Sequence, residues 1–349
     1  MSREKIAFFD SKPFVREYFD SANKEFDYVT KYFSSHLNSD TVGISYGYDA
    51  VCVFVNDIVS ADVIDILAKH NVQLIALRCA GYNNVDFKAA YGKIHVVRVP
   101  EYSPYAVAEH AGALILTLNR KTHRAYYRTR DSNFNINGLL GFDMYGKTAG
   151  IIGTGKIGKI LIRILKGFGM KILAYDIYPD RVFEKEAGCT YVELEQLYRE
   201  SDIISLHCPL TRDTHHIINT ASIKNMKDGV MIINTGRGQL IDTRGLITGL
   251  KSGKIGSAGL DVYEEESEYF FEDYSSMIIS DDILARLLTF PNVLVTSHQG
   301  FFTHEALTNI ADVTLKNIDD FFHGRKLVNE ICYQCNEEPC KKKEVGKCF

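Results

Sequence analysis

The sequence lacks the long apolar runs, the basic surplus and the leader that mark several classes of protein. Its longest apolar stretch, residues 111–118, is well short of the roughly 20 residues that a membrane-spanning helix needs. Lys and Arg total 40 against 44 Asp and Glu, so the composition shows no footprint of nucleic-acid binding. The first residues reach only a brief apolar stretch, residues 6–9, unlike a secretory signal. We therefore expect a cytoplasmic protein that binds neither membrane nor nucleic acid.

The sequence also lacks internal repeats and low-complexity segments. Its 349 residues are enough for two domains, each with its own hydrophobic core. Cys52, Cys79, Cys189 and Cys208 lie in or beside apolar segments. This placement predicts reduced, mostly buried thiols, as is usual in the cytoplasm.

A glycine-rich turn organises the chain. An apolar strand predicted at residues 149–152 leads into Gly153, Gly155 and Gly158, and apolar residues at helical spacing follow. A second apolar strand ends at Asp176. This is the dinucleotide-binding fingerprint in its strand–turn–helix–strand context. The first glycine permits the tight turn, the second lets a pyrophosphate approach the backbone, and the third lets the helix pack closely on the strand.

Asp176 favours NAD over NADP. A carboxylate here can accept hydrogen bonds from the adenosine ribose, whereas a 2′-phosphate would meet like charge. No Arg follows at positions 177–180. The alternative interpretation is a glycine-rich turn in an α/β protein that binds no dinucleotide, and the surrounding elements together with Asp176 make it the weaker one.

Apolar strands alternate with helical patterns along most of the chain, which predicts an α/β protein with parallel sheets and helices on both faces. Helical patterns cover residues 61–70, 105–130 and 304–321, and residues 28–48 are ambiguous. The second half holds the six strands expected of a dinucleotide domain. The predicted strands lie at residues 5–9, 50–55, 74–79, 95–99, 149–152, 171–176, 203–206, 230–234, 255–261 and 293–296.

Polar side chains follow the last three of these strands. Arg237 comes after residues 230–234, Glu266 lies just beyond Asp261, and His298 follows the last strand. Alone, each could be a surface or structural residue, and residues 264–266 could be a solvated acidic run. Because the carboxyl ends of parallel strands share one edge of a sheet, the three side chains can converge on one hydride acceptor. The planar guanidinium of Arg237 suits a substrate carboxylate.

Several longer segments resemble the D-isomer-specific 2-hydroxyacid dehydrogenases. The likeness runs from about residue 50 to residue 330 and is densest at residues 76–81, 106–111, 145–150, 204–209, 234–238 and 298–303. It is closest to the branch of the family that reduces pyruvate to D-lactate with NADH. The first 45 residues match weakly, and the tail after about residue 331 lies outside the family pattern.

The resemblance implies a domain division. Residues 1–101 and 302–349 would form a flavodoxin-like substrate domain, and residues 102–301 would form a Rossmann NAD domain inserted into it. The cleft between them would hold nicotinamide and substrate. The family also implies a dimer or higher oligomer built on the NAD domains.

The resemblance also implies residue roles. Arg237 would bind the substrate carboxylate, His298 would donate the proton, and Glu266 would partner the histidine. The substrate would also meet Ala80, Gly81, Tyr102 and Phe301. The cofactor-binding residues implied are Gly153, Gly155, Lys156, Ile157, Gly158, Asp176, His207, Cys208, Pro209, Thr235, Gly236 and Asp261.

Two alternative functions stay open from the sequence. One is another reductase of the same family, acting on hydroxyisocaproate, glycerate or phosphoglycerate. The other is an NADH-sensing protein that binds a partner, because some relatives of this fold act as transcriptional corepressors. The intact Arg237, Glu266 and His298 favour an enzyme over a sensor.

The C-terminal tail contains Cys332, Cys335, Cys340 and Cys348. Four thiolates in a short span could bind a tetrahedral zinc ion, and the Cys-x-x-Cys pair has usable ligand spacing. The second pair is spaced irregularly, so a reduced tail, or one that forms disulfides on oxidation, is the alternative. The sequence leaves a metal at these cysteines undecided.

Overall fold

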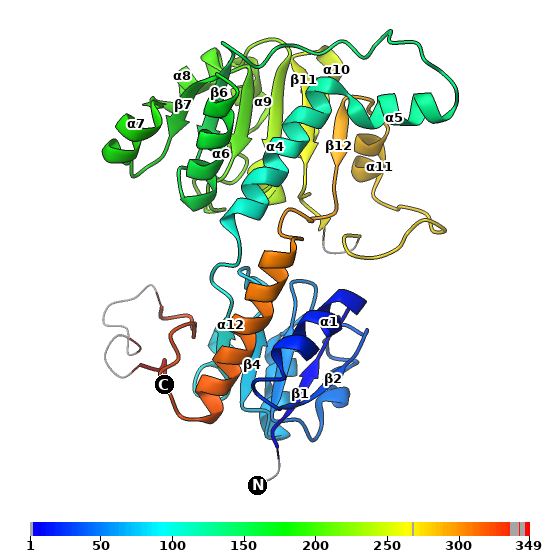
Figure 1. The fold of residues 1–349 in the computed structure, drawn as a ribbon. Coiled ribbons are helices and arrows are strands. Elements are labelled where there is room, and N and C mark those ends of the chain that lie inside the picture. The colour runs from blue at the N-terminus through cyan, green and yellow to red at the C-terminus, as the bar shows by residue number, and fades with distance from the viewer. Residues whose placement is uncertain (1–2, 267–268, 336–341, 343–345) are drawn as a thin grey trace. The chain divides into compact units, whose positions relative to one another are not determined.

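We describe a computed structural model of the chain, in which residues 3–266, 269–335, 342 and 346–349 are described (Figure 1). The chain divides into two compact units, one formed by Met1–Ser103 with Phe302–Phe349 and the other by Pro104–Phe301. Each unit has its own sheet and its own core. No helix in the described part of the chain is both long enough and apolar enough to cross a membrane.

The second unit contains a parallel sheet of seven strands in the order β12-β11-β10-β9-β6-β7-β8. The chain starts in the middle at β6, winds outward to β8, and then crosses back to β9, which is the order of a doubly wound dinucleotide-binding sheet. The strands are β6 Thr148–Ile152, β7 Lys171–Tyr175, β8 Thr190–Tyr191, β9 Ile203–Leu206, β10 Val230–Asn234, β11 Ile255–Leu260 and β12 Val293–Val295.

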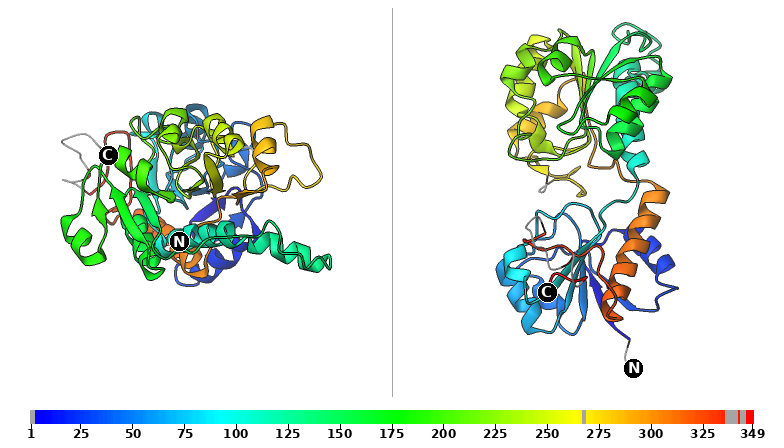
Figure 2. Two further views of the ribbon diagram at one scale, coloured as in Figure 1. Left: turned by 90° about the horizontal axis from the view of Figure 1, so that it is seen from above. Right: turned by 90° about the vertical axis from the view of Figure 1, so that its left-hand side faces the viewer.

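Helices cover both faces of this sheet, as the right-hand view of Figure 2 shows. One core cluster joins the sheet to α4 Pro104–Arg120, α6 Lys156–Gly167 and α7 Arg181–Ala187. The other joins it to α8 Leu194–Glu200, α9 Thr220–Lys224, α10 Thr243–Ser252 and α11 Asp282–Leu288. With both faces covered, the strands are almost wholly apolar, and this is why the sequence shows them as continuous apolar runs.

Two sequence predictions for this unit need correction. The helix expected over residues 105–130 is two helices, because Lys121 adopts a left-handed conformation (φ 50°) between α4 and α5 Thr122–Arg130. No residue of α5 is buried. The sheet also has one strand more than the sequence predicted, since the two-residue β8 pairs with β7 at the sheet edge. So short a strand offers too few residues for a periodicity to be recognised.

The first unit has a five-stranded parallel sheet in the order β2-β1-β3-β4-β5, which is the flavodoxin-like order. The ambiguous residues 28–48 supply the edge strand β2 and a short 3-10 helix at Val42–Ser45. The strands are β1 Lys5–Phe8, β2 Val29–Tyr32, β3 Ala50–Val53, β4 Leu74–Leu77 and β5 His95–Arg98. The helices are α1 Pro13–Ala22, α2 Ala61–Lys69, α3 Phe87–Ala90 and α12 His304–Phe322.

Candidate active site

The glycine turn between β6 and α6 leaves room for a ligand at one position only. A Cβ atom on Gly158 would lie 2.1 Å from the carbonyl oxygen of Gly153, so helix and strand approach too closely for any side chain. Gly153 has a φ of +93°, which favours glycine. A Cβ atom on Gly155, the N-cap of α6, would meet nothing within 4 Å. The open side of the turn therefore faces the first backbone N–H groups of α6, where a phosphate group fits.

Asp176 lies directly after β7 and holds this turn. Its Oδ2 accepts hydrogen bonds from the backbone N–H (2.6 Å) and the hydroxyl (2.9 Å) of Thr154. Its Oδ1 accepts from the backbone N–H of Tyr178 at 2.9 Å. A carboxylate has about four acceptor positions, so one remains for a ribose hydroxyl. The sequence identified Asp176 but missed Thr154.

The loop after β9 lies against the glycine turn. A Cβ atom on Gly153 would come within 2.5 Å of the backbone nitrogen of Cys208, so the two loops touch. Burial lowers the pKa of His207 to about 4 and raises the pKa of Cys208 to about 11. At neutral pH both side chains are therefore uncharged, while the neighbouring Pro209 is exposed. This gives an uncharged wall of the kind that an adenine-ribose unit could lie against.

The loop after β10 carries Thr235, Gly236 and Arg237. Buried Asn234 fixes the loop, because its side chain accepts from the N–H of Gly236 (3.0 Å) and donates to the carbonyl of Arg237 (2.8 Å). Thr235 is 7% exposed, and its hydroxyl has no hydrogen-bond partner among the described residues. A buried hydroxyl without a partner is costly, and a bound ligand would satisfy it. Together with the open glycine turn, this hydroxyl indicates that the residues present fit NAD.

Arg237 is half-buried, and one of its nitrogen atoms donates to the carbonyl of Gly236 at 2.8 Å. Within the part of the chain that the structure describes, no carboxylate forms an ion pair with it. The remaining donors of the guanidinium can therefore receive an external carboxylate in a bidentate manner.

Glu266 and His298 form an ion pair at the ends of two neighbouring strands. His298 Nδ1 lies 3.0 Å from Glu266 Oε1, and Glu266 Oε2 accepts from the backbone N–H of Tyr263 at 3.0 Å. Because an ionised carboxylate can only accept, this geometry places a proton on Nδ1 and leaves Nε2 as the nitrogen that can meet a substrate. The ring of Phe271 lies beside the imidazole, with centroids 6.1 Å apart.

Close contacts connect the three strand-end loops. A Cβ atom on Gly238 would lie 2.0 Å from the carbonyl carbon of Tyr263, so the loop that carries Arg237 packs directly on the loop that carries Glu266. Glu266 in turn pairs with His298. The structure thus brings together the three loops that carry these residues, and it pairs two of the side chains, Glu266 and His298, directly.

The acidic run 264–266 is not a uniform solvated stretch. Glu264 lies 2.8 Å from His216 Nε2 and accepts from the backbone N–H of Thr243 at 2.9 Å. Glu265 is exposed, and Glu266 pairs with His298. Three adjacent glutamates therefore have three different environments, which their spacing in the sequence does not reveal.

Asp261 anchors the loop that carries His298. Its side chain is 1% exposed and accepts from the Thr296 hydroxyl (2.5 Å) and the Gly300 N–H (2.8 Å), with His110 Nε2 at 3.2 Å. Burial opposes ionisation, but the hydrogen bonds and the His110 ring outweigh it and lower the pKa of Asp261. The buried carboxylate thus positions the His298 loop, and a contact with the cofactor stays a prediction. The sequence missed the part played by His110 and Thr296, although His110 lies in a segment of family likeness.

The predicted residues of the first unit lie in the segments that follow β4 and β5. The backbone N–H groups of Ala80 and Gly81 donate to no partner within the described ranges, while Arg98 donates to the carbonyl of Ala80 at 2.7 Å. Two such N–H groups suit an anion. Tyr102 is half-buried in the segment that follows β5. Phe301, which ends the other unit, is 7% exposed and lies near Phe271, with ring centroids 6.5 Å apart.

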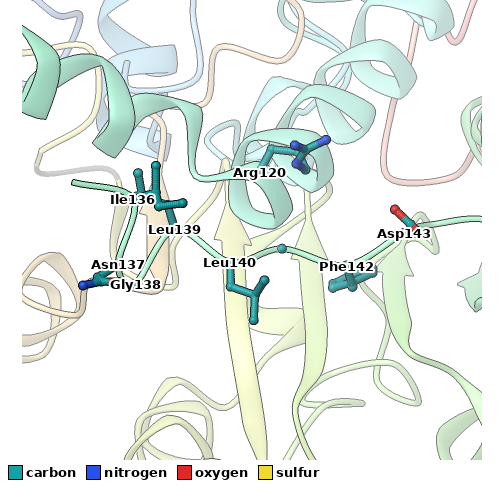
Figure 3. Close-up of a pocket in the computed structure, with 9 residues that line it drawn as sticks. Arg120, Ile136, Asn137, Gly138, Leu139, Leu140, Phe142 and Asp143 are labelled. Atoms are coloured by element: carbon teal, nitrogen blue, oxygen red, sulfur yellow. The ribbon is translucent and has the colours of Figure 1, made fainter. Parts of the chain in front are cut away.

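A separate hollow of about 820 Å³ lies beside the segment that leads from α5 to β6 (Figure 3). Arg120 and residues 136–143 line it. None of the predicted site residues is among them. It therefore carries no part of the chemistry described above.

Comparison with known proteins identifies the family. Residues 112–300 match the model of the D-isomer specific 2-hydroxyacid dehydrogenase, NAD binding domain. The chain is 53% identical to a 2-hydroxyacid dehydrogenase homolog of Haemophilus influenzae and 52% identical to the D-lactate dehydrogenase of Escherichia coli, each over 94% of this chain and 99% of the relative. The chain belongs to the D-isomer-specific 2-hydroxyacid dehydrogenases.

Solved structures of the family agree at the level of the whole fold. The pyruvate reductase of Chlamydomonas reinhardtii superposes with a TM-score of 0.89 at 44% identity, and the match covers 94% of this chain and 98% of that one. As a D-isomer-specific 2-hydroxyacid dehydrogenase, the chain is an NAD-dependent oxidoreductase of the predicted α/β class. The sequence predictions of family, fold class and cofactor are confirmed.

Proposed function

We propose that this dehydrogenase reduces pyruvate to D-lactate with NADH, and that Arg237, Glu266 and His298 perform the reaction. The observation that carries the proposal is the contact chain from Gly238 through Tyr263 and Glu266 to His298, which joins the three strand-end loops. Relatives named D-lactate dehydrogenase, about half identical over nearly the whole chain, support the same activity.

The chemistry of each residue follows from where charge develops. NADH supplies the hydride when it is bound. Negative charge then grows on the carbonyl oxygen of the keto acid, and a protonated imidazole within hydrogen-bond reach of that oxygen can neutralise it. Glu266, 3.0 Å from Nδ1, stabilises the positive imidazole and fixes the ring so that Nε2–H donates the proton.

Arg237 would hold the substrate carboxylate with a paired hydrogen bond and so orient the carbonyl. The positive charge of the Arg237 guanidinium also stabilises the negative charge that develops on the carbonyl oxygen. In the reverse direction, neutral His298 accepts the hydroxyl proton of the 2-hydroxy acid while Arg237 keeps the same role.

The aromatic residues near His298 favour a small substrate side chain. Phe271 lies beside the His298 ring, and Phe301 lies near Phe271. Bulky aromatic walls leave room for a methyl group more readily than for a branched chain. Pyruvate is therefore proposed ahead of the 2-keto acid of hydroxyisocaproate, which remains the alternative within the family.

Initial rates with a panel of 2-keto acids test the substrate. Pyruvate, hydroxypyruvate, phenylpyruvate and 2-ketoisocaproate are each reduced with NADH, and kcat/KM is compared. We expect the highest kcat/KM for pyruvate. A higher value for 2-ketoisocaproate or hydroxypyruvate would reassign the substrate and keep the enzyme class, whereas NADH binding without turnover of any member would favour the sensor.

We propose that a second copy of this chain covers the α5 region and the segment after it. Side chains there that are between 56% and 88% exposed are Tyr126, Tyr127, Phe134, Ile136 and Leu140. So many exposed apolar groups in one segment are typical of a protein interface. Light scattering coupled to size-exclusion chromatography should give a dimer or tetramer, and Ile136→Asp should shift it towards the monomer. A wild-type monomer at micromolar concentration would contradict this.

We also propose that the enzyme works in the cytoplasm. Every cysteine among the described residues is a free thiol, which suits a reducing compartment. Fractionation of the source cells followed by immunoblotting tests it, and recovery of the protein outside the cytoplasmic fraction would contradict it.

A further inference from the structure

The C-terminal tail is built into the first unit at the edge of its sheet. The backbone N–H of Ile331 donates to the carbonyl of Val96 (2.9 Å), and the N–H of Arg98 donates to the carbonyl of Asn329 (3.1 Å). Val97 and Glu330 pair as an antiparallel bridge. The tail therefore covers the free edge of β5 and leads straight into Cys332.

Glu330 fastens both ends of the tail. Its side chain is fully buried, with Oε1 2.5 Å from His95 Nδ1 and Oε2 accepting from the backbone N–H of Cys348 at 2.5 Å. Its carbonyl accepts from Lys342 Nζ at 2.6 Å. The last residue, Phe349, stacks on His95 with ring centroids 4.2 Å apart. The carboxylate of Glu330 thus holds Cys348 close to the segment that leads into Cys332.

Three cysteine sulfur atoms meet where these two segments converge. The Sγ atoms of Cys332, Cys335 and Cys348 all lie within 4.8 Å of one another, and those of Cys332 and Cys335 are 3.8 Å apart. A tetrahedral zinc ion with Zn–S bonds of about 2.3 Å separates its sulfur ligands by about 3.8 Å. A disulfide would need about 2.05 Å, so the sulfur atoms of Cys332 and Cys335 are at the separation of two zinc ligands rather than of a disulfide, with Cys348 Sγ close by.

The surroundings of the sulfur atoms also suit a metal. The backbone N–H of Cys332 donates to Cys335 Sγ at 3.1 Å, a bond that favours a thiolate and fixes its direction. Cys348 is 2% exposed, while Cys332 and Cys335 are partly exposed, so an ion could enter from one side. Three thiols packed this closely cannot all pair as disulfides, and a single ion satisfies all three.

We propose that Cys332, Cys335 and Cys348 bind one zinc ion, which fastens the C-terminus to the first unit. We assign zinc to this site because thiolates bind zinc tightly and zinc prefers tetrahedral sulfur sites. Three of the four zinc ligands are found among the described residues. Cys340, the fourth cysteine of the tail, lies outside the described residues. The site belongs to the unit that does not carry Arg237, Glu266 and His298, and the role we assign to it is to stabilise that unit.

The test uses the untagged full-length protein purified in reducing agent. Elemental analysis should find about one zinc per chain in the wild type and in Cys189→Ala, a matched control that removes a buried thiol elsewhere. Cys332→Ala, Cys335→Ala and Cys348→Ala should each lose most of the zinc. Stripping the metal should lower the Tm of the wild type by several degrees and leave the Tm of Cys348→Ala unchanged, because only a bound ligand contributes to stability.

Binding of Co²⁺ tests the proposal on the wild-type protein alone, without any variant that has to fold. Wild-type protein stripped of metal should take up one Co²⁺ per chain and show a thiolate-to-cobalt charge-transfer band, which added Zn²⁺ abolishes. Reduced wild-type protein that contains no zinc and develops no such band would overturn the proposal. Equal zinc in Cys348→Ala and wild type would overturn it as well.

Discussion

His298 combines an unusual backbone conformation with a fixed side chain. Its φ of 47° lies in the left-handed region, which a non-glycine residue adopts at a cost of about 1–3 kcal/mol. The N–H of His298 donates to the carbonyl of Asp261 at 2.8 Å, and Glu266 holds the ring. These contacts offset the cost of the backbone conformation and fix the orientation of the imidazole, and so the position of Nε2.

Replacing His298 should remove the proton donor without disturbing the fold. In His298→Gln, kcat/KM for pyruvate should fall by about two orders of magnitude or more, as is typical for a positioned acid. Steady-state rates measure the loss, and fluorescence titration should give an unchanged Kd for NADH. His323→Gln, which alters an exposed histidine after α12, is the control and should retain wild-type rates. A variant at position 298 that keeps near-full kcat/KM would refute the assignment.

The carboxylate of Asp176 should make the enzyme prefer NADH to NADPH. Asp176→Ser removes the negative charge that would repel a 2′-phosphate, so kcat/KM with NADPH should rise relative to kcat/KM with NADH. The NADH value itself should fall, because Asp176 also holds the Thr154 N–H of the glycine turn. The ratio of the two values is the measurement. An unchanged ratio would mean that the carboxylate does not face the ribose.

At the scale of elements, the glycine turn offers a matched pair of substitutions. Gly155→Ala adds a methyl group in open space, so the protein should fold normally while NADH binds more weakly. Gly158→Ala places the same methyl group 2.1 Å from the Gly153 carbonyl oxygen, so it should lower the Tm by several degrees. Thermal unfolding and NADH titration of both proteins separate the two effects. Equal losses of stability would contradict the roles given to the two glycines.

Most elements could be predicted from the sequence because buried parallel strands and an apolar helix face leave a direct pattern. The break between α4 and α5 at Lys121 could not be predicted, because a left-handed residue other than glycine has no dependable sequence signal. The strand β8 was missed because two residues show no periodicity. The sequence analysis identified Asp261 but not its part in anchoring the His298 loop. Its partner His110 comes from α4, which is distant in the sequence.

At the scale of the whole molecule, the three residues proposed to perform the reaction and the C-terminal tail belong to separate units. Arg237, Glu266 and His298 lie within Pro104–Phe301, and the cysteine cluster lies within the other unit. Each unit has its own sheet. Removal of metal should therefore lower the Tm and leave the Kd for NADH unchanged, as calorimetry and fluorescence titration can check. A parallel loss of NADH binding would mean that the tail acts on the cofactor site.

The most direct test of the central claim is the handedness of the product. Purified enzyme at catalytic concentration is given pyruvate and NADH, and the lactate formed is resolved on a chiral column. The account predicts that the enzyme turns over many times and forms D-lactate alone. Formation of L-lactate, or no turnover of pyruvate, would contradict it.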